Sequence, residues 1–412
     1  MTLDGEHTVA PAIVMVCTGP APAALVLPPN AELGRRIVID DEVLDVPDER
    51  MSRDHATVRR EHGTWVVKDL DSRNGTYVNG DRAQGEVRRR GDVVLRLGHT
   101  VFVLLADGRG HGKLPDGEQP IIGPELARAH AELRRHAGAP LVLVQGESGT
   151  GKQLAARLWH DSGPRASGPV VAVNCAVIPE GMAERLLFGG KKGAIETIGH
   201  YQMARGGTLV LADIAGLDAT AQVRLRKVLE EPGDNAPGIV ATGHELRSVV
   251  SDGRLRDDLY QRLARTAVTL PPLRARKVDI ARFVQREVAA VAGTGKLAAH
   301  PKLVEACCMR AWPGNVVELC STVRFAARDA KSGNQDLVRV DLLGPNAGLS
   351  NTVSGQTAVE RKSPVVRPDR DILVAAIARA NGDISVAARG LNMHRDQLKK
   401  LLEDYGIVPD ES

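Results

Sequence analysis

The stretch LVLVQGESGTGKQ, residues 141–153, limits the possible folds of this chain more than any other feature. An apolar run leads into a glycine-rich loop that ends in Lys152, and the amphipathic run QLAARLWHDS follows. Glycines let backbone N–H groups curl around phosphates, the helix N-terminus adds a positive dipole, and the lysine reaches the terminal phosphates. The stretch therefore predicts a strand, a phosphate-binding loop and a helix. The expected phosphate-binding residues are Gly146, Glu147, Ser148, Gly149, Thr150, Gly151, Lys152 and Gln153.

Composition narrows the class of protein. A chain of 412 residues has room for roughly two to four domains. Basic and acidic residues number 54 and 51, so a contact with DNA must come from a local patch rather than from the net charge of +3. Five scattered cysteines without a CxxC pair predict reduced thiols, and we assign no metal-ligating residue. The absence of a basic leader and of a long apolar run predicts a soluble, cytoplasmic protein without a membrane contact.

The sequence divides into five segments. Residues 9–105 contain short β-branched runs between Gly, Asn, Asp and Pro clusters, which is typical of a β-sandwich. Residues 121–340 alternate amphipathic helices with apolar strands, which is typical of a parallel α/β sheet. Residues 369–408 show helical periodicity only. The remaining segments, 106–120 and 341–368, are rich in Gly, Pro and polar residues, and we expect linkers there.

Six motifs in the central segment follow one another in a recognisable order. They are GESGTGKQ, VAVNCAVIPEGMAERLLFG, GHYQMARGGTLVLADI, GRLRDDLYQRL, LPPLRARKVDI and WPGNVVEL. Together they resemble the AAA+ module of the sigma-54-dependent transcriptional activators, the bacterial enhancer-binding proteins. The resemblance implies an α/β P-loop core with a helical subdomain, ATP and Mg²⁺ as ligands, and sigma-54 RNA polymerase holoenzyme as a partner. It also implies that Asn174 couples the catalytic acid to the nucleotide.

The motifs depart from this family around the chemistry of hydrolysis. The family ends the GGTLVLADI strand on Asp-Glu, which organise the magnesium and polarise the attacking water, whereas this chain has Ala212 and Asp213. Ala212 cannot bind a metal, and the Asp213 carboxylate is one methylene shorter than the expected base, so we expect weak or absent hydrolysis. The family's nucleotide-contacting arginine is Val317 here, its γ-phosphate-sensing asparagine is Gly243, and Gln153 replaces a glutamate. A shorter GAIETI replaces the GAFTGA loop that touches the sigma factor.

Two arginines of GRLRDDLYQRL match the family's trans-acting arginines. By the resemblance, Arg256 and Arg262 stabilise phosphoryl charge across a subunit interface and belong with Asp213 to the catalytic set. The alternative is that they form surface ion pairs with Asp257 and Asp258.

Three signatures near the N-terminus resemble a forkhead-associated (FHA) domain: GRRIVID at 34–40, MSRDHATV at 51–58 and DSRNGTYVNG at 71–80. The resemblance implies recognition of a phosphothreonine-containing protein, and a dianionic phosphate suits a guanidinium and a hydroxyl on loops of a rigid sandwich. His55 is expected to be structural. Hairpin turn chemistry alone is the alternative explanation of the Asn-Gly stretches. The implied phosphopeptide-binding residues are Arg35, Ser52, Arg53, Arg73 and Asn74.

The segment RDILVAAIARANGDISVAARGLNMHRDQLKKLLEDYGI, 370–407, resembles the Fis-type helix-turn-helix that ends most enhancer-binding proteins. In such a module the third helix enters the major groove of promoter or enhancer DNA, and the protein acts as a homodimer or higher homo-oligomer. A small helical bundle for protein interaction is the alternative. The candidate DNA contacts are Arg389, His394, Arg395, Gln397, Lys399 and Lys400.

The resemblances together imply a multidomain chain with an N-terminal β-sandwich, a central α/β P-loop AAA+ domain with a helical subdomain, and a C-terminal all-α helix-turn-helix. The implied function is that of a cytoplasmic bacterial transcription regulator that binds DNA, recognises phosphothreonine and binds ATP with impaired hydrolysis. Two alternatives stay open. One is an active AAA+ activator of sigma-54 polymerase that uses Asp213, and the other is a phosphopeptide adaptor or repressor without nucleotide dependence.

Overall fold

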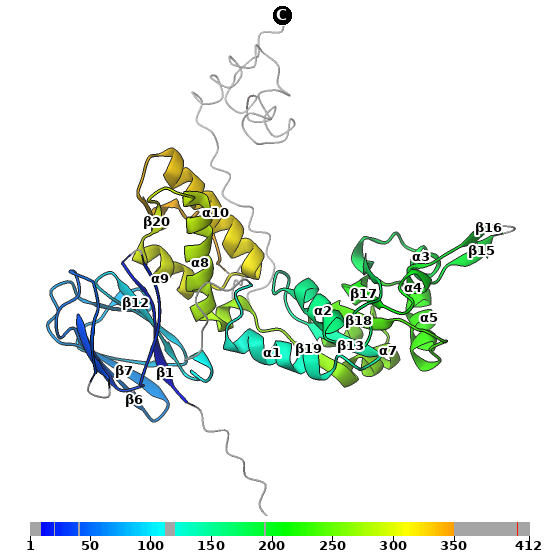
Figure 1. Ribbon diagram of the computed structural model, residues 1–412, viewed down its shortest axis with the longest axis horizontal. Helices are drawn as coiled ribbons and strands as arrows, with labels where there is room; N and C mark the ends of the chain where they lie inside the picture. Colours follow the sequence, from blue (N-terminus) through cyan, green and yellow to red (C-terminus); the bar gives the residue numbers. More distant parts are fainter. Residues whose placement is uncertain are drawn as a thin grey trace, which may run out of the picture. The chain divides into compact units, whose positions relative to one another are not determined.

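The computed structural model describes residues 10–19, 21–39, 42–111, 120–192, 195–349 and 402. The chain divides into two units at residue 350, and Figure 1 shows the described part of the first unit as a coloured ribbon. The helix-turn-helix expected at 369–408 and all six candidate DNA contacts lie outside the described residues. Among the residues that the structure describes, no helix is both long enough and apolar enough to span a bilayer.

The N-terminal part is a β-sandwich, as the sequence predicts. Its strands are β1 (Ala12–Thr18), β2 (Ala21–Leu27), β3 (Ala31–Leu33), β4 (Arg36–Ile39), β5 (Glu42–Asp45), β6 (Ala56–Glu61), β7 (Thr64–Asp69), β8 (Thr76–Val78), β9 (Asp81–Arg82), β10 (Glu86–Arg90), β11 (Val93–Leu97) and β12 (Thr100–Leu105). One sheet has the order β2-β1-β12-β11-β8-β9, the facing sheet has the order β10-β7-β6-β3, and β4 pairs with β5. Trp65 and Phe102 lie in the core between the sheets, both fully buried.

The central part is a parallel sheet with helices on both faces. Its elements are α1 (Pro124–Arg135), β13 (Leu141–Gln145), α2 (Lys152–Asp161), β14 (Val170–Asn174), η2 (Cys175–Val177), α3 (Ala183–Phe188), β15 (Gly190–Lys192), β16 (Ile195–Thr197), α4 (His200–Met203), β17 (Thr208–Ala212), η3 (Ile214–Gly216), α5 (Ala219–Glu230), β18 (Gly238–Gly243), α6 (Leu246–Ser251), α7 (Asp257–Leu263), η4 (Ala264–Thr266) and β19 (Ala267–Thr269). The strand order is β14-β17-β18-β13-β19, and every pairing is parallel.

Alternating side chains of these strands enter two separate cores. Leu143 and Leu211 pack on one face with α3 to α7, and Val144 and Val210 pack on the other face with α1 and α2. This double burial explains why the central strands are nearly continuous apolar runs rather than alternating ones.

A short hairpin follows α3, in the segment that we compared with the family's sigma-contacting loop. Strands β15 and β16 pair antiparallel, with Gly190 opposite Thr197. A Cβ on Gly199 would lie 2.3 Å from the backbone nitrogen of Gly189, so the two chain ends meet at the hairpin base only because glycine occupies this position.

A helical subdomain follows the sheet. It consists of η5 (Leu273–Ala275), α8 (Lys277–Ala292), β20 (Ala298–Ala299), α9 (Pro301–Met309), α10 (Asn315–Ser332), β21 (Leu337–Val338) and η6 (Val340–Leu342). Residues 341–349, which we placed in a linker, pack on this subdomain. Trp312 donates its backbone N–H to the carbonyl of Gly348, and Gly348 donates to Glu318 Oε1 at 3.0 Å. These contacts are made by backbone groups, so the polar composition of the segment did not indicate them.

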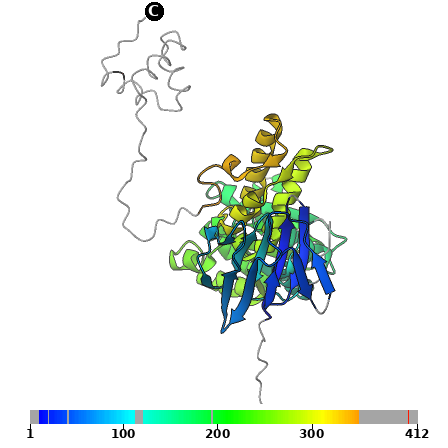
Figure 2. The ribbon, with the colours of Figure 1, turned by 90° about the vertical axis from the view of Figure 1, so that its left-hand side faces the viewer.

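The sandwich and the helical subdomain share one hydrophobic core, which the sequence analysis did not anticipate. The strands β1 and β12 lie beside α8 and α9 (Figures 1 and 2). On these strands, the residues that point away from the sandwich interior, such as Val14 and Val103, pack with side chains of α8 and α9. Arg96 on β11 points to the same side and donates from Nε to Glu305 Oε2 at 2.6 Å, and both side chains are under 10% exposed. Residues 106–111, which we placed in a linker, also contact the central domain, since His111 lies 3.0 Å from Glu125 Oε1 of α1.

Candidate functional site

The phosphate-binding loop connects β13 to α2, as the sequence predicts. Gly151 is the residue before the first turn of α2 and has a φ of 101°, a backbone conformation that glycine adopts without strain. Gly149 has a φ of 75°, and a Cβ there would lie 2.2 Å from the carbonyl oxygen of Gly314. The two glycines therefore meet a conformational and a steric requirement of the loop.

Lys152 is the first residue of α2, and its side chain folds back over the loop. Its Nζ donates to the carbonyl oxygens of Gly146 at 2.8 Å and Glu147 at 2.9 Å. Burial lowers the pKa of Lys152, while the negative charges of Asp213 and Glu147 act in the opposite direction. The ammonium group therefore stays beside the loop amides, where a phosphate would lie.

A cavity of about 690 Å³ opens beside the loop. Three parts of the chain form its walls, namely the carboxyl ends of the sheet strands, the segment that leads into α1, and the helical subdomain. Besides the loop residues, its lining is Pro120, Ile121, Leu126, Leu154, Asn174, Val210, Ala212, Asp213, Thr242, His244, Arg276, Phe283, Arg286, Val316 and Val317.

The structure brings Asn174, Ala212 and Asp213 together on the wall of this cavity. Asn174 and Ala212 are register partners at the ends of β14 and β17. The Asn174 Oδ1 accepts a hydrogen bond from the backbone of Ala176 at 3.0 Å. Asp213 follows in left-handed backbone with a φ of 51°, and its N–H donates to Thr242 Oγ1 at 3.2 Å. The wall therefore presents the Asp213 carboxylate and, next to it, a methyl group.

The other departures also lie at or next to the cavity. Val317 lines it with a side chain that is 68% exposed. Gly243 ends β18, and a Cβ on it would lie 2.6 Å from Leu246 Cδ2, so an asparagine at this position requires Leu246 to move. The neighbouring His244 lines the cavity instead.

Arg256 and Arg262 do not line the cavity. Arg256 forms a bidentate ion pair with Asp258, with N–O distances of 2.9 and 3.0 Å. Arg262 donates to the carbonyl of Leu229 at 3.0 Å. Within one chain, both guanidinium groups therefore have partners outside the cavity, and the pair with Asp258 is the one that we named as the alternative.

Two residues that the sequence analysis did not single out hold the phosphate-binding loop from the helical subdomain. Arg274 makes a bidentate ion pair with Glu147 at 2.6 and 2.9 Å, which chiefly lowers the pKa of that carboxyl group. Asn315 is fully buried and donates from Nδ2 to Glu147 Oε2 at 3.0 Å and to the Ser148 carbonyl at 2.9 Å, while its Oδ1 accepts from the Leu273 N–H at 2.7 Å. Both residues stand in motifs that mark the family resemblance, and that was the available signal.

The expected phosphopeptide residues meet on three connected loops of the sandwich. The N–H of Arg35 donates to the Ser52 carbonyl at 2.9 Å, and the Ser52 hydroxyl accepts from the N–H of Arg73 at 3.1 Å. Asn74 donates from Nδ2 to the carbonyl of Arg50 at 2.6 Å. The Arg35 Nε is buried and finds no hydrogen-bond partner within the part of the chain that the structure describes. Arg53 lies on the same loop as Ser52 with an exposed side chain.

His55 is a structural residue, as expected from the sequence. It is fully buried, and its Nδ1 accepts from the N–H of Ser52 at 3.0 Å, while its Nε2 lies 3.3 Å from the carbonyl of Gly75. Burial lowers its pKa. The ring therefore fixes the two loops that bear Ser52 and Asn74 relative to each other.

Comparison with known proteins agrees with this geometry. The model of the Sigma-54 interaction domain matches residues 123–269, and the model of the FHA domain matches residues 32–98. The DNA-binding transcriptional regulator NtrC of Escherichia coli strain K12 is 32% identical, and the alignment covers 71% of this chain and 70% of NtrC. The chain belongs to the NtrC family of sigma-54 activators.

Other members of the NtrC family align over smaller shares of their length. NtrC of Azospirillum brasilense is 35% identical over 64% of this chain and 57% of its own length. The chain spans about half the length of the first curated relatives that it matches, with shares of 57%, 41% and 48%. Among solved structures, NtrX from Brucella abortus is 28% identical with a TM-score of 0.51, covering 69% of this chain and 68% of NtrX. These findings confirm the sigma-54 and FHA resemblances.

The hydrogen bonds of Asn315 predict a measurable loss of stability on substitution. Asn315→Gly keeps the left-handed backbone, which has a φ of 52°, and removes only the buried amide, so we expect urea denaturation to give a free energy of unfolding lower by about 1 to 3 kcal/mol. Asn315→Ala adds left-handed strain of about 1 to 2 kcal/mol. The matched control is Asn334→Ala, an exposed asparagine with a φ of 54°, where only the strain applies. Equal stability of Asn315→Gly and the parent would contradict the assigned role.

Proposed function

We propose that this chain is a DNA-binding transcription regulator that recognises phosphothreonine through its FHA domain and binds ATP with weak or no hydrolysis. The observation that supports it best is the contrast within one cavity. The glycines of the phosphate-binding loop and Lys152 are present, whereas the wall has a methyl group at Ala212 where the family has a carboxylate. Nucleotide binding then controls the conformation of the chain or its assembly into a homo-oligomer, and it does not drive mechanical remodelling of sigma-54 polymerase.

The residues of the cavity suit ATP. Loop amides and Lys152 offer donors for phosphates, and Ile121, Leu126 and Phe283 offer an apolar wall for the base. NtrX from Brucella abortus, 27% identical with a TM-score of 0.51, has been solved in complex with ATP. A magnesium ion usually binds one or two carboxylates together with phosphate oxygens, and among the described residues that line the cavity only Asp213 has a carboxylate.

Restoring the family's two carboxylates tests the proposed loss of hydrolysis. We expect Ala212→Asp combined with Asp213→Glu to raise phosphate release by about 10²-fold, because a positioned base and a metal-organising carboxylate return together. The isosteric uncharged control is Ala212→Asn with Asp213→Gln, which leaves release at the parent's level. Nucleotide affinity is measured on the same samples. Robust release by the parent that Asp213→Asn abolishes would favour the active-ATPase alternative instead.

The phosphothreonine proposal is supported by the Arg35 Nε, which is buried and has no hydrogen-bond partner among the described residues, and by the backbone hydrogen bond that joins Arg35 to Ser52. A guanidinium and a hydroxyl together bind a phosphate dianion, and the nearby Asn74 amide can pair with the backbone of an extended peptide. Arg53 and Arg73 add positive charge at the same loops.

Two adjacent arginines give a matched test of this site. We expect Arg35→Ala to lower the affinity of the chain for a phosphothreonine peptide mixture at least 10-fold, because a charge-assisted phosphate contact contributes about 1.5 to 3 kcal/mol. Arg36→Ala removes an exposed arginine that pairs with Asp45 at 3.6 Å and leaves the affinity unchanged. Capture is measured by fluorescence anisotropy against the unphosphorylated mixture. An equal effect of the two substitutions would contradict the proposal.

DNA binding is assigned to residues 369–408, with sigma-54 holoenzyme as the partner that the family implies. The candidate contacts are Arg389, His394, Arg395, Gln397, Lys399 and Lys400. We expect the combined Lys399→Ala and Lys400→Ala variant to weaken duplex binding and to reduce the salt dependence by about one counterion for each phosphate that a lysine no longer neutralises. Electrophoretic mobility shifts at several salt concentrations measure this. Unchanged binding would favour the protein-interaction alternative.

A further inference from the structure

One buried carboxylate connects the phosphopeptide loops to the turn between β11 and β12. We define these loops as residues 46–55 and 70–75. Asp48 is 4% exposed, and its Oδ1 accepts from the N–H of Arg50 at 3.0 Å. Its Oδ2 accepts from the N–H of His99 at 2.7 Å and from the Thr100 hydroxyl at 2.9 Å. A shift of the first loop therefore acts directly on residues 98–100.

The same turn lies on helix α9 of the helical subdomain. The His99 ring lies 5.6 Å from the ring of His300, the residue that caps α9. Arg96 lies on β11, two residues before the turn begins at Gly98. From there it makes its buried ion pair with Glu305, which lies about one turn beyond the first residues of α9. Because breaking one half of a buried ion pair costs several kcal/mol, the turn and α9 move together.

The far end of α9 leads to the phosphate-binding loop. Met309 is the last residue of α9. Its side chain lies against Gly80 of the sandwich, because a Cβ added to Gly80 would lie 3.0 Å from Met309 Cε. The next residues form the turn that contains Trp312, which is fully buried, and Asn315, whose amide donates to the carbonyl of Ser148. Helix α9, which contacts the turn between β11 and β12, is thus continuous with the turn that holds the phosphate-binding loop.

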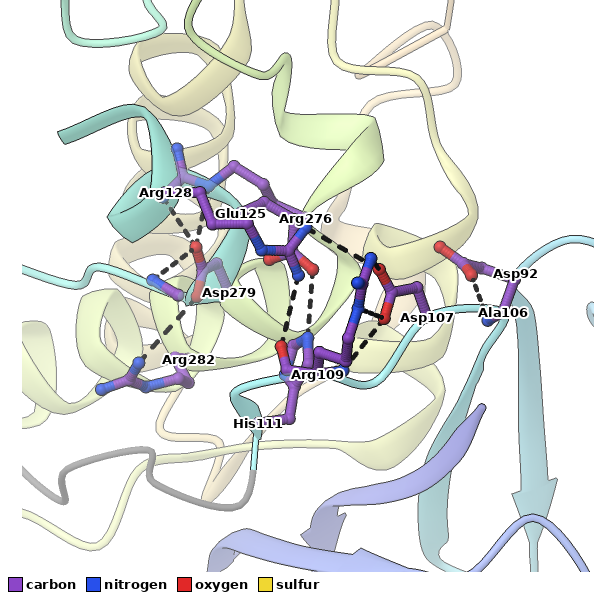
Figure 3. A network of polar contacts seen from close by, with 11 residues as sticks. Asp92, Ala106, Asp107, Arg109, His111, Glu125, Arg128, Arg276, Asp279 and Arg282 are labelled. Atoms are coloured by element: carbon purple, nitrogen blue, oxygen red, sulfur yellow. Dashed lines mark hydrogen bonds and ion pairs between the residues drawn. The ribbon is translucent and has the colours of Figure 1, made fainter. Parts of the chain in front are cut away.

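A second set of contacts connects the sandwich to helix α1 (Figure 3). His111 Nε2 lies 3.0 Å from Glu125 Oε1, and this hydrogen bond helps to hold the pKa of Glu125 below its ordinary value although burial acts to raise it. Arg128 donates to the carbonyl of Arg109 at 3.2 Å, and Arg109 pairs with Asp107 at 2.6 Å. The segment that leaves β12 is therefore anchored on α1.

Helix α1 is in turn joined to α8 at the cavity. The N–H of Gly123 donates to Asp279 Oδ2 at 3.1 Å, and Asp279 pairs with Arg276 at 2.7 Å, with both side chains 1% exposed (Figure 3). Arg276 and Ile121 both line the cavity. The FHA sandwich thus contacts two of the three walls of the nucleotide cavity, the α1 segment and the helical subdomain.

We propose that the FHA sandwich braces these two walls of the cavity, so that a phosphothreonine peptide on its loops tightens nucleotide binding. The inference rests on the proposed function, because it needs a ligand at each site. A nucleotide in the cavity contacts both walls and stabilises their present arrangement. A peptide bound to the loop that contains Asp48 stabilises the same arrangement through α9, and the coupling is reciprocal by thermodynamic necessity.

The test measures both affinities on the full chain. Fluorescent ADP is titrated with and without a saturating phosphothreonine peptide mixture, and the peptide is titrated with and without saturating ADP. We expect a tightening of at least 5-fold, and the same factor in both directions. The unphosphorylated peptide mixture has no effect. If both ligands bind and neither changes the affinity of the other, the proposed coupling is overturned while the proposed function stands. If either ligand fails to bind alone, the proposed function falls and the inference falls with it.

Charge reversal at the shared core tests whether the sandwich transmits the effect. Glu305→Arg places two arginines together, and we expect it to separate the sandwich from α9 and to reduce the coupling factor to one while each ligand still binds. The exchange of Arg96→Glu with Glu305→Arg restores the ion pair and the coupling. Separation is read from thiol labelling of Cys17, which lies in the shared core and is 1% exposed, against Cys175, which lies in the core of the parallel sheet.

A milder variant covers the case in which Glu305→Arg does not fold. Met309→Glu changes a side chain that is 39% exposed and contacts the turn at Gly80. We expect it to reduce the coupling factor without changing thermal unfolding by more than a few degrees. Coupling at the parent's strength in a variant whose Cys17 is labelled rapidly would overturn the proposed path.

Discussion

The hydrogen bonds between Asn315 and the phosphate-binding loop are the contact on which the arrangement of the rest depends. One buried amide bonds to Ser148, Glu147 and Leu273, so that the phosphate-binding loop and two elements of the helical subdomain, η5 and α10, meet at a single side chain. Buried polar groups are costly when they lose a partner, and this position therefore tolerates little movement. Because α9 ends just before this turn and also bears the buried partner of Arg96, the position of the sandwich depends on it as well.

The residues that we assign to nucleotide binding differ from those that we assign to hydrolysis, so the proposed loss of hydrolysis does not require a loss of binding. Phosphates are assigned to the backbone amides of the loop and to Lys152, which this chain shares with the family motif. Hydrolysis in the family depends on side chains at the ends of strands, and two departures from the family, Ala212 and Gly243, stand at the ends of β17 and β18. A Cβ on Gly243 would meet the Cδ2 of Leu246, so the family's asparagine requires this flexible side chain to move. In the proposed function the cavity binds nucleotide, and Asp213 is the carboxylate left for catalysis on its described lining.

The sequence was sufficient for features that depend on neighbouring residues. The phosphate-binding loop, the two sheets of the sandwich and the place of His55 follow from local pattern and turn chemistry, and the structure confirms them. The pair Arg96–Glu305 could not be predicted, because its partners are 209 positions apart and each looks like a surface charge in its own segment. A signal for the shared core did exist. Strand VFVLL is apolar at every position, whereas a sandwich strand with one face in water would alternate.

The shared core also determines how any movement of the helical subdomain must proceed. Separating the sandwich from α8 and α9 would expose apolar side chains of both and leave Glu305 or Arg96 buried without its charge partner. Moving the sandwich together with the subdomain costs neither of these. A displacement of the subdomain relative to the sheet must instead strain two sets of polar contacts. One is the set of hydrogen bonds from Asn315 to Glu147 and Ser148, and the other is the set of contacts of His111 and Asp279 at α1. The resistance to opening of the cavity is therefore shared between the phosphate-binding loop and the α1 junction.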